Sequence, residues 1–245
     1  MRFTIIILTL ILVQPIIGQN NLLELKSHVE KFDYVEQFAS IKTAEFKTLD
    51  VLTTFDELER EIDFGYKHHR ILVMPNPGWD IKLNFISKNG LIIIGWISEY
   101  PLNKEKHINL STFKNNSEFL KSYVTKHNAF YKTDNTEKDF KEQILTEFVV
   151  GFGCGEVGLD IPSDSKKMLR LAKKRKRKTL TKYLTSFSPE LQTLGAIGLL
   201  KIGKLSSEQK RIIEHLKNKN SVIFSCSGCL YGIGETFSER IEYYE

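Results

Sequence analysis

The stretch RILVMPNPGWDIKLNFISKNGLIIIGWI, residues 70–97, decides the fold class of this chain. It opens with a short apolar run at residues 70–74. Residues 75–78, which read Pro-Asn-Pro-Gly, break this run, because proline fixes φ and glycine permits a positive φ. Residues 81–85 then alternate between apolar and polar side chains, which is the pattern of a half-buried strand.

A tight turn and a second apolar segment complete this stretch. Asn89-Gly90 is a strong hairpin signal, because both residues tolerate a positive φ. Residues 91–97 are almost wholly apolar, so we predict that both of their faces are buried and that they form the central strand. The expected fold is α+β, with a small antiparallel β-meander and helices packed on one side of it.

Helices are predicted before the meander. Residues 21–39 carry apolar side chains at near-helical spacing, with charged residues between them. Thr54 to Glu57 has the pattern of a capping box, which predicts a helix over residues 55–64.

The chain after the meander is predicted to be a loop followed by two helices. Residues 101–116 are polar and contain glycosylation-type sequons at Asn109 and Asn115. The apolar spacing that follows predicts helices over residues 118–131 and 137–150.

The N-terminus has the form of an export signal. Arg2 supplies a basic start, and residues 3–13 are apolar. This run is shorter than the roughly 20 residues that a membrane-spanning helix needs. We therefore expect residues 1–18 to be a signal peptide cleaved between Gly18 and Gln19. The mature chain is then secreted or periplasmic, with no transmembrane span.

The C-terminal half is predicted to be helical from Ser163 onward. Ser188-Pro189 combines an N-cap with a proline at the first helical position, so a helix is expected to begin there and to stop at Gly203. Ser206 to Gln209 has the capping-box pattern, which predicts a further helix to about Lys217.

Leu180 to Lys204, LTKYLTSFSPELQTLGAIGLLKIGK, resembles a single HEAT-type helical repeat. A leucine-bearing helix is followed by a short turn and a second helix, in which Gly195, Ala196 and Gly198 would let a neighbouring helix approach closely. The resemblance covers about a tenth of the chain, and no second copy follows at the repeat period. It implies a helical hairpin, HEAT-like packing in the C-terminal half and a binding role, and it brings no functional residues.

The highest charge density lies in KKMLRLAKKRKRKTLTK, residues 166–182, which holds ten Lys or Arg and no acidic residue. The chain has 35 basic and 30 acidic residues, so its formal charge of +5 originates here and the remainder is acidic overall. Six consecutive cations cannot continue a buried helix face, so a break or an exposed joint is expected within them. These six anion-binding candidates are Lys173, Lys174, Arg175, Lys176, Arg177 and Lys178.

Three cysteines, Cys154, Cys226 and Cys229, suggest a disulfide in an exported chain. A bridge between Cys226 and Cys229 closes a very small loop and stabilises little, whereas a bridge from Cys154 to either one stabilises more. The alternative is thiol–disulfide exchange at Cys226 and Cys229, which requires the first cysteine at a helix N-terminus. No metal site is expected, because zinc usually takes four ligands and a second Cys pair is missing.

Two other patterns are interpreted as structural. Gly153 to Gly158 matches the dinucleotide-binding string G-x-G-x-x-G, but a predicted helix precedes it, so a tight turn is expected and no cofactor. His68 and His69 are neighbours in a strand and point to opposite faces, so we expect surface residues and not a shared ligand site. The chain has no G-x-S-x-G string, no H-E-x-x-H string and no calcium loop.

These patterns predict a signal peptide over residues 1–18, an α+β domain over 19–150 and a helical domain with a cysteine-containing tail over 151–245. Whether the two domains form one continuous body is left open. The preferred function is non-catalytic: an exported or envelope-associated interaction module whose basic segment binds an anionic surface or a protein partner. Nucleic acid is not expected outside the cell. The alternatives are a thiol–disulfide oxidoreductase and a hydrolase whose residues the sequence does not identify.

Overall fold

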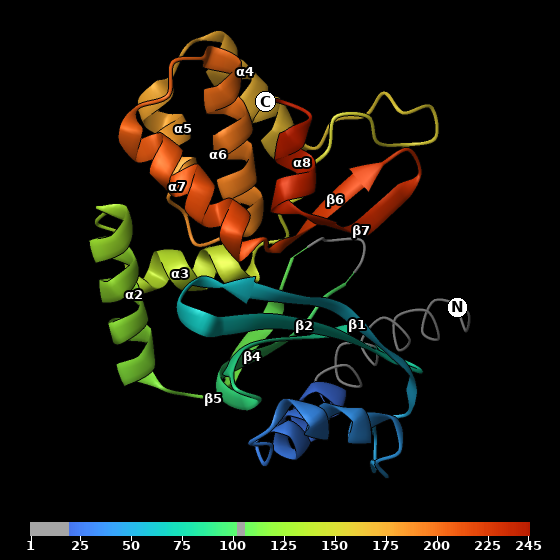
Figure 1. Ribbon diagram of the computed structural model, residues 1–245. Coiled ribbons are helices and arrows are strands. Elements are labelled where there is room, and N and C mark those ends of the chain that lie inside the picture. Colours follow the sequence, from blue (N-terminus) through green and yellow to red (C-terminus); the bar gives the residue numbers. More distant parts are fainter. Residues whose placement is uncertain (1–19, 102–105) are drawn as a thin grey trace, which may run out of the picture. The chain divides into compact units, whose positions relative to one another are not determined.

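The structure, a computed structural model, describes residues 20–101 and 106–245 of the chain (Figure 1). The signal peptide expected at residues 1–18 lies outside the described residues. None of the described helices is both long enough and apolar enough to cross a membrane.

Contacts divide the chain into two compact units. The first contains the chain up to Glu59 together with Tyr66–Asn116, and the second contains Arg60–Gly65 and Ser117–Glu245. The expected division between residues 150 and 151 therefore falls inside the second unit.

The first unit is built on a five-stranded sheet in which each strand lies beside the next one in the chain. Its strands are β1 (Val51–Ile62), β2 (Tyr66–Pro75), β3 (Ile81–Lys88), β4 (Leu91–Glu99) and β5 (Ile108–Lys114). The meander predicted within residues 70–97 is confirmed as β2, β3 and β4, which pair antiparallel. The prediction that residues 91–97 form the central strand is wrong, because β5 pairs with the outer edge of β4 and leaves β3 in the middle.

Two predicted elements of this half differ in the structure. Residues 55–64 were expected to be helical, but most of them belong to β1. Here Leu58, Arg60 and Ile62 are buried and alternate with more exposed glutamates, which is the period of a strand. This alternation outweighs the local capping-box pattern. Residues 108–114, expected in a loop, form β5 because they extend the ladder of β4.

The core of the first unit is mainly aliphatic and includes the packed rings of Phe32, Phe38, Phe85 and Phe113. Residues 20–29 are helical and are followed by the 3-10 helix η1 (Val35–Lys42), so the predicted helix over 21–39 is divided in two. Phe38 of η1 stacks on Phe85 of β3 with ring centroids 4.4 Å apart. The ring of Phe113 in β5 occupies the space above Gly95, where a Cβ atom would lie 2.2 Å from it.

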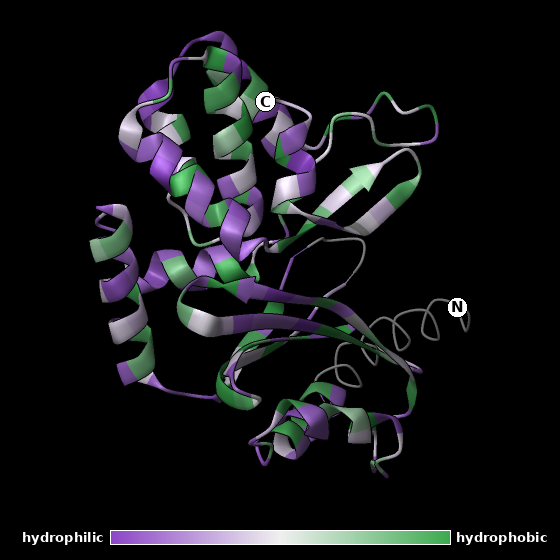
Figure 2. Cartoon of the chain, viewed as in Figure 1, coloured by the Kyte–Doolittle hydropathy of each residue, from purple (hydrophilic) through white to green (hydrophobic). Residues whose placement is uncertain are grey.

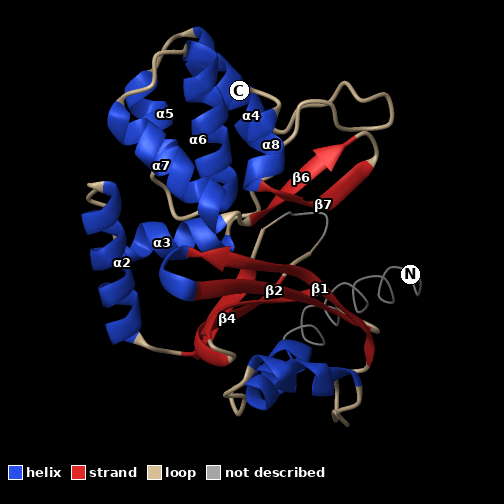
Figure 3. Cartoon of the chain, in the orientation of Figure 1, coloured by secondary structure: helices blue, strands red, loops and turns tan. Residues whose placement is uncertain are grey.

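The second unit is mainly helical and also contains a two-stranded antiparallel ribbon, which a last short helix follows (Figure 3). Its elements are α2 (Ser117–Tyr131), α3 (Glu137–Leu145), α4 (Ser163–Lys173), α5 (Arg177–Leu184), α6 (Pro189–Ile202), α7 (Ser207–Lys219), β6 (Val222–Ser227), β7 (Leu230–Thr236) and α8 (Phe237–Glu242). The α+β class is thus confirmed, with the meander in the N-terminal half and helices in the C-terminal half.

Helix α6 lies at the centre of this unit, since every residue from Pro189 to Leu199 is buried. Its predicted start is confirmed: the Ser188 hydroxyl accepts a hydrogen bond from the backbone N–H of Leu191. Gly195 lets α5 approach closely, because a Cβ atom there would lie 2.2 Å from the backbone nitrogen of Leu184. The predicted helical hairpin is therefore present as α5 and α6.

Candidate functional site

The basic stretch folds as two helices joined by a short bend. Helix α4 is followed by Lys174 as its C-cap, and Arg175 takes the left-handed conformation with a φ of 51°. The backbone N–H of Arg175 bonds the carbonyl of Ala172 at 2.9 Å, which closes the end of α4. Met168 on α4 and Leu180 on α5 are fully buried, so the predicted break between two apolar stripes is confirmed.

Nine basic side chains of this stretch are exposed. They are Lys166, Lys167, Arg170, Lys173, Lys174, Arg175, Lys176, Lys178 and Lys182, and we call them the cationic surface. Spacings of three or four residues place Lys166, Arg170 and Lys173 on one face of α4, and the same spacing relates Lys178 to Lys182 on α5. In the described part of the chain, none of the nine forms an ion pair with a carboxylate.

Arg177 differs from the other five candidates of the basic run. Its side chain is partly buried and donates to the carbonyl oxygen of Gly203 at 2.6 Å and to Oε1 of Gln209 at 3.4 Å. These contacts tie the start of α5 to the end of α6 and to α7. Arg177 therefore has a structural role and is excluded from the cationic surface.

The cysteines join the glycine-rich turn to the C-terminal ribbon. Cys154 and Cys226 form a disulfide with a Cα–Cα distance of 5.6 Å, and both are buried. Cys229 is free and exposed. Cys226 lies in β6 and not at a helix N-terminus, where a thiolate would be stabilised. Nothing in this geometry favours a Cys226–Cys229 dithiol, and the oxidoreductase alternative stays a prediction.

The string Gly153 to Gly158 forms a tight turn, as expected. The backbones of Cys154 and Asp160 exchange two hydrogen bonds, of 2.7 and 2.8 Å, across its base. Gly155 and Gly158 have positive φ values of 81° and 65°, which the turn requires. The first helix after the turn, α4, begins only at Ser163, so no helix N-terminus opens at the glycines.

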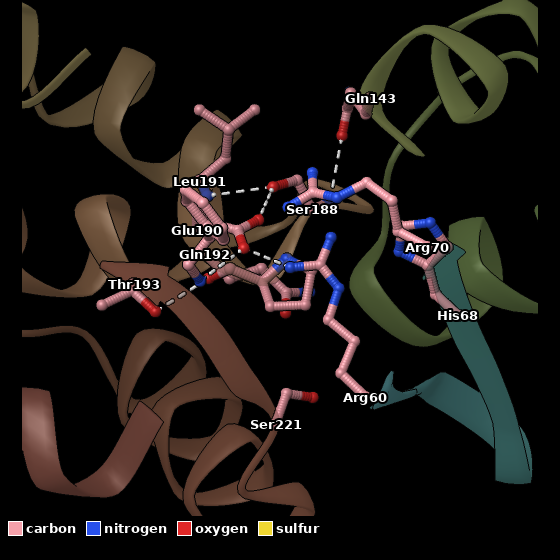
Figure 4. A network of polar contacts seen from close by, with 12 residues as sticks. Arg60, His68, Arg70, Gln143, Ser188, Glu190, Leu191, Gln192, Thr193 and Ser221 are labelled. Carbon is pink, nitrogen blue, oxygen red and sulfur yellow. Dashed lines mark hydrogen bonds and ion pairs between the residues drawn. The ribbon is translucent and has the colours of Figure 1, made fainter. Parts of the chain in front are cut away.

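A buried ion pair in the second unit was not predicted from the sequence. Arg60 and Glu190, with side chains 2% exposed, form a salt bridge. Figure 4 shows Arg60 and the hydroxyl of Ser188 directed at the carboxylate, and the Ser188 bond is 2.7 Å long. The backbone N–H of Phe224 donates to Glu190 at 3.0 Å. Every bond of this carboxylate holds protein groups together, so its role is structural.

A second buried carboxylate, Asp63, collects three donors. It accepts hydrogen bonds from the Tyr131 hydroxyl at 3.0 Å and from Nε2 of His215 at 3.0 Å, and Nζ of Lys219 lies 3.2 Å away. Burial would raise the pKa of Asp63, but the nearby Lys219 charge and the His215 hydrogen bond outweigh it and hold the pKa well below its usual range. The same carboxylate, together with burial, raises the pKa of Tyr131.

His127 lies beside this cluster on α2 and is fully buried. Its ring is 4.1 Å from that of Phe187 between centroids, and its Nε2 is 3.3 Å from the carbonyl of Ser186. Its Nδ1 has no hydrogen-bond partner among the residues that the structure describes. Burial lowers the pKa of His127 to about 4, so the ring is neutral at physiological pH. No sequence pattern predicted either cluster, because their members are far apart in the chain.

The expectation that His68 and His69 are surface residues is wrong. Both are buried within the strand β2. They do lie on opposite faces: His68 bonds Asn84 at 3.2 Å, and His69 bonds Ser87 at 2.8 Å. Sequence analysis missed their burial because the polar partners that satisfy them come from the neighbouring strand, β3.

A cavity of about 310 Å³ lies in the first unit between η1 and the strands β1 and β2. Phe38 and Ile71 line it, together with Glu59 and His69. Of its polar lining residues, Glu59 bonds Lys67 at 2.7 Å and His69 bonds Ser87, and Glu36, Lys42 and Thr54 also line the cavity. Among the residues that the structure describes, no group of three or more His, Cys, Asp or Glu side chains is placed to hold a metal ion.

Comparison of the chain with protein-family models, with curated proteins and with solved structures found no match. Inferences about function therefore rest on the sites described above. Among them, the cationic surface is the one whose charged groups are exposed and form no ion pair with a carboxylate of the described chain.

Proposed function

We propose that this chain is an exported, non-catalytic interaction module that binds polyanionic partners through its cationic surface. The observation that carries the proposal is the concentration of nine exposed cations on two short helices and their bend, none of which forms an ion pair among the described residues. Such a field attracts phosphate, sulfate or carboxylate groups over roughly a Debye length and is weakened by salt.

The chemistry of the other sites supports a binding role over catalysis. The buried carboxylates Asp63 and Glu190 are each engaged by several protein donors, which is typical of structural carboxylates. The cationic surface has long, exposed side chains that adapt to a partner of variable geometry. It is suited to a charged surface more than to one small ligand of fixed shape.

The test neutralises the bend and its neighbours in one variant, Lys173→Gln, Lys174→Gln, Arg175→Gln, Lys176→Gln and Lys178→Gln. Arg177 is left intact because it holds α5 in place. A matched control variant carries the same change of net charge at five exposed lysines elsewhere, Lys31, Lys42, Lys121, Lys126 and Lys210.

We expect the first variant to bind heparin and vesicles with 30% phosphatidylserine at least tenfold more weakly than the wild type, since each Lys or Arg near an anionic surface contributes about 1 kcal/mol. Binding of the wild type should fall steeply between 50 and 300 mM salt. The control variant should lose much less. Equal affinity of both variants and the wild type would refute the proposal.

A further inference from the structure

Two neighbouring loops of the second unit carry exposed apolar side chains at their tips. Val157 and Leu159 in the glycine-rich turn are 77% and 78% exposed. Leu230 and Tyr231, at the start of β7, are 65% and 56% exposed. Large apolar side chains are usually this exposed singly, so four of them on two adjoining loops indicate an interaction surface.

The two loops are fastened to each other. The disulfide joins Cys154 in the turn to Cys226 in β6. The backbone N–H of Gly228, in the tip of the ribbon, donates to the carbonyl of Gly153 at 2.8 Å. Figure 1 shows the turn and the end of the β6–β7 ribbon projecting together beyond the helices of their unit, and Figure 2 shows hydrophobic segments on both.

This bracing keeps the apolar tips exposed. The disulfide and the paired backbones of Cys154 and Asp160 close the base of the turn. The tip residues therefore stay directed away from the core, and a partner can bind them without first ordering a flexible loop. We call Val157, Leu159, Leu230 and Tyr231 the apolar tips.

The cationic surface begins directly after the same turn. Helix α4 starts at Ser163, three residues beyond Asp160, and Lys166 and Lys167 are exposed in its first two turns. Apolar side chains on projecting loops next to a concentration of Lys and Arg are the combination that anchors a protein at an anionic membrane surface. Tyrosine also favours the membrane–water interface.

We propose that the apolar tips insert into the interfacial region of an anionic lipid bilayer while the cationic surface contacts its headgroups. This inference rests on the proposed function and names the partner as a membrane surface. Convex tips favour a bilayer over a protein partner, because a stable protein interface needs about 800 Å² of fitted surface on each side. We expect the exposed carboxylate of Glu156 at the same tip to limit the depth of insertion, because a charged group is costly in the hydrocarbon region.

The first experiment compares two polyanions. The variant Val157→Ser, Leu159→Ser, Leu230→Ser and Tyr231→Ser should bind heparin like the wild type but bind vesicles with 30% phosphatidylserine about tenfold more weakly. The difference in vesicle affinity between the wild type and this variant should persist at 300 mM salt, because salt screens electrostatic attraction but not the insertion of apolar side chains. Glu156→Gln should strengthen vesicle binding only.

The second experiment uses the exposed thiol of Cys229, which lies in the ribbon turn directly before Leu230. An environment-sensitive fluorophore on Cys229 should shift to the blue and gain intensity with these vesicles and not with heparin. A control label at position 210 in α7, introduced as Lys210→Cys in a Cys229→Ser background, should not respond.

The outcomes separate this inference from the proposed function. Vesicle binding that is lost in the charge-neutralised variant but unchanged in the tip variant, with no spectral shift at Cys229, would overturn the insertion and leave the cationic surface in place. A blue shift of the Cys229 fluorophore that grows with protein concentration in the absence of lipid would show that the apolar tips contact a second copy of the chain, and it would overturn the proposal. Unchanged binding of the charge-neutralised variant would refute the proposed function itself.

Discussion

At the scale of single residues, the second unit buries charged groups in its interior. Asp63 is surrounded by Tyr131, His215 and Lys219, and Glu190 is paired with Arg60. A buried charge costs several kcal/mol unless partners compensate it, and both carboxylates are compensated from several directions. His127 beside them is the exception, since its Nδ1 is buried without a partner and the ring is held neutral.

The lowered pKa of His127 predicts how stability depends on pH. The folded chain titrates this ring near pH 4 and the unfolded chain near pH 6.5, so the unfolded state binds more protons between these values. The stabilising contribution is therefore complete above pH 6.5 and is lost as the pH falls toward 4. Between pH 7 and pH 5, we expect the wild type to lose about 2 kcal/mol more free energy of unfolding than a His127→Phe variant.

Urea denaturation followed by far-UV circular dichroism measures this difference, because the signal comes mainly from the helices. Tryptophan fluorescence would not, since Trp79 and Trp96 both belong to the first unit. A His215→Gln variant serves as the control for removal of an imidazole ring from the same cluster. If the wild type and His127→Phe lost equal free energy of unfolding between pH 7 and pH 5, the lowered pKa of His127 would not be the cause of the pH dependence.

At the scale of elements, the helical hairpin of α5 and α6 depends on close backbone contact. Gly195 faces the backbone of Leu184, whereas Gly198 faces the flexible side chain of Leu180. The small residues that suggested a close approach are therefore not equivalent. Only the first of these glycines meets an obstacle that cannot rotate away.

This difference makes a paired prediction. Gly195→Ala places a methyl group 2.2 Å from the backbone nitrogen of Leu184, so α5 and α6 must separate and stability should fall by about 1–3 kcal/mol. Gly198→Ala places it 2.5 Å from a methyl of Leu180, which can change rotamer, and should cost less. Thermal unfolding of the two variants compares them directly. A larger loss of stability for Gly198→Ala than for Gly195→Ala would show that Gly195 is not the point of closest approach between α5 and α6.

At the scale of the whole chain, one disulfide connects segments that are 72 residues apart in sequence. A cross-link of this length stabilises by about 4 kcal/mol in the chain-entropy model, because it restricts the unfolded state. A mass measurement before and after reduction detects this cross-link.

We expect the exported protein to begin at Gln19 and to contain one disulfide and one free thiol. Alkylation before reduction should modify Cys229 alone, and peptide mapping should join Cys154 to Cys226. Cys154→Ser should lower stability by up to about 4 kcal/mol, and Cys229→Ser should leave it unchanged. Recovery of a Cys226–Cys229 peptide would contradict this pairing, and a mass that includes Met1 would contradict the expected cleavage.

From the sequence alone, the α+β class, the three central segments of the meander, the break in the basic run and the start of α6 were predictable. Each is encoded by residues that are neighbours along the chain: an alternating pattern, a run of like charges, or a cap beside its helix. Only the tertiary structure decided that residues 55–62 join a sheet, that Cys154 pairs with Cys226, and that Arg177 turns inward. It alone placed the partners of Asp63 and brought the apolar tips together. These features depend on contacts between residues that are far apart in the sequence. A local sequence pattern does not specify such contacts, because they form only when the segments pack together in the core.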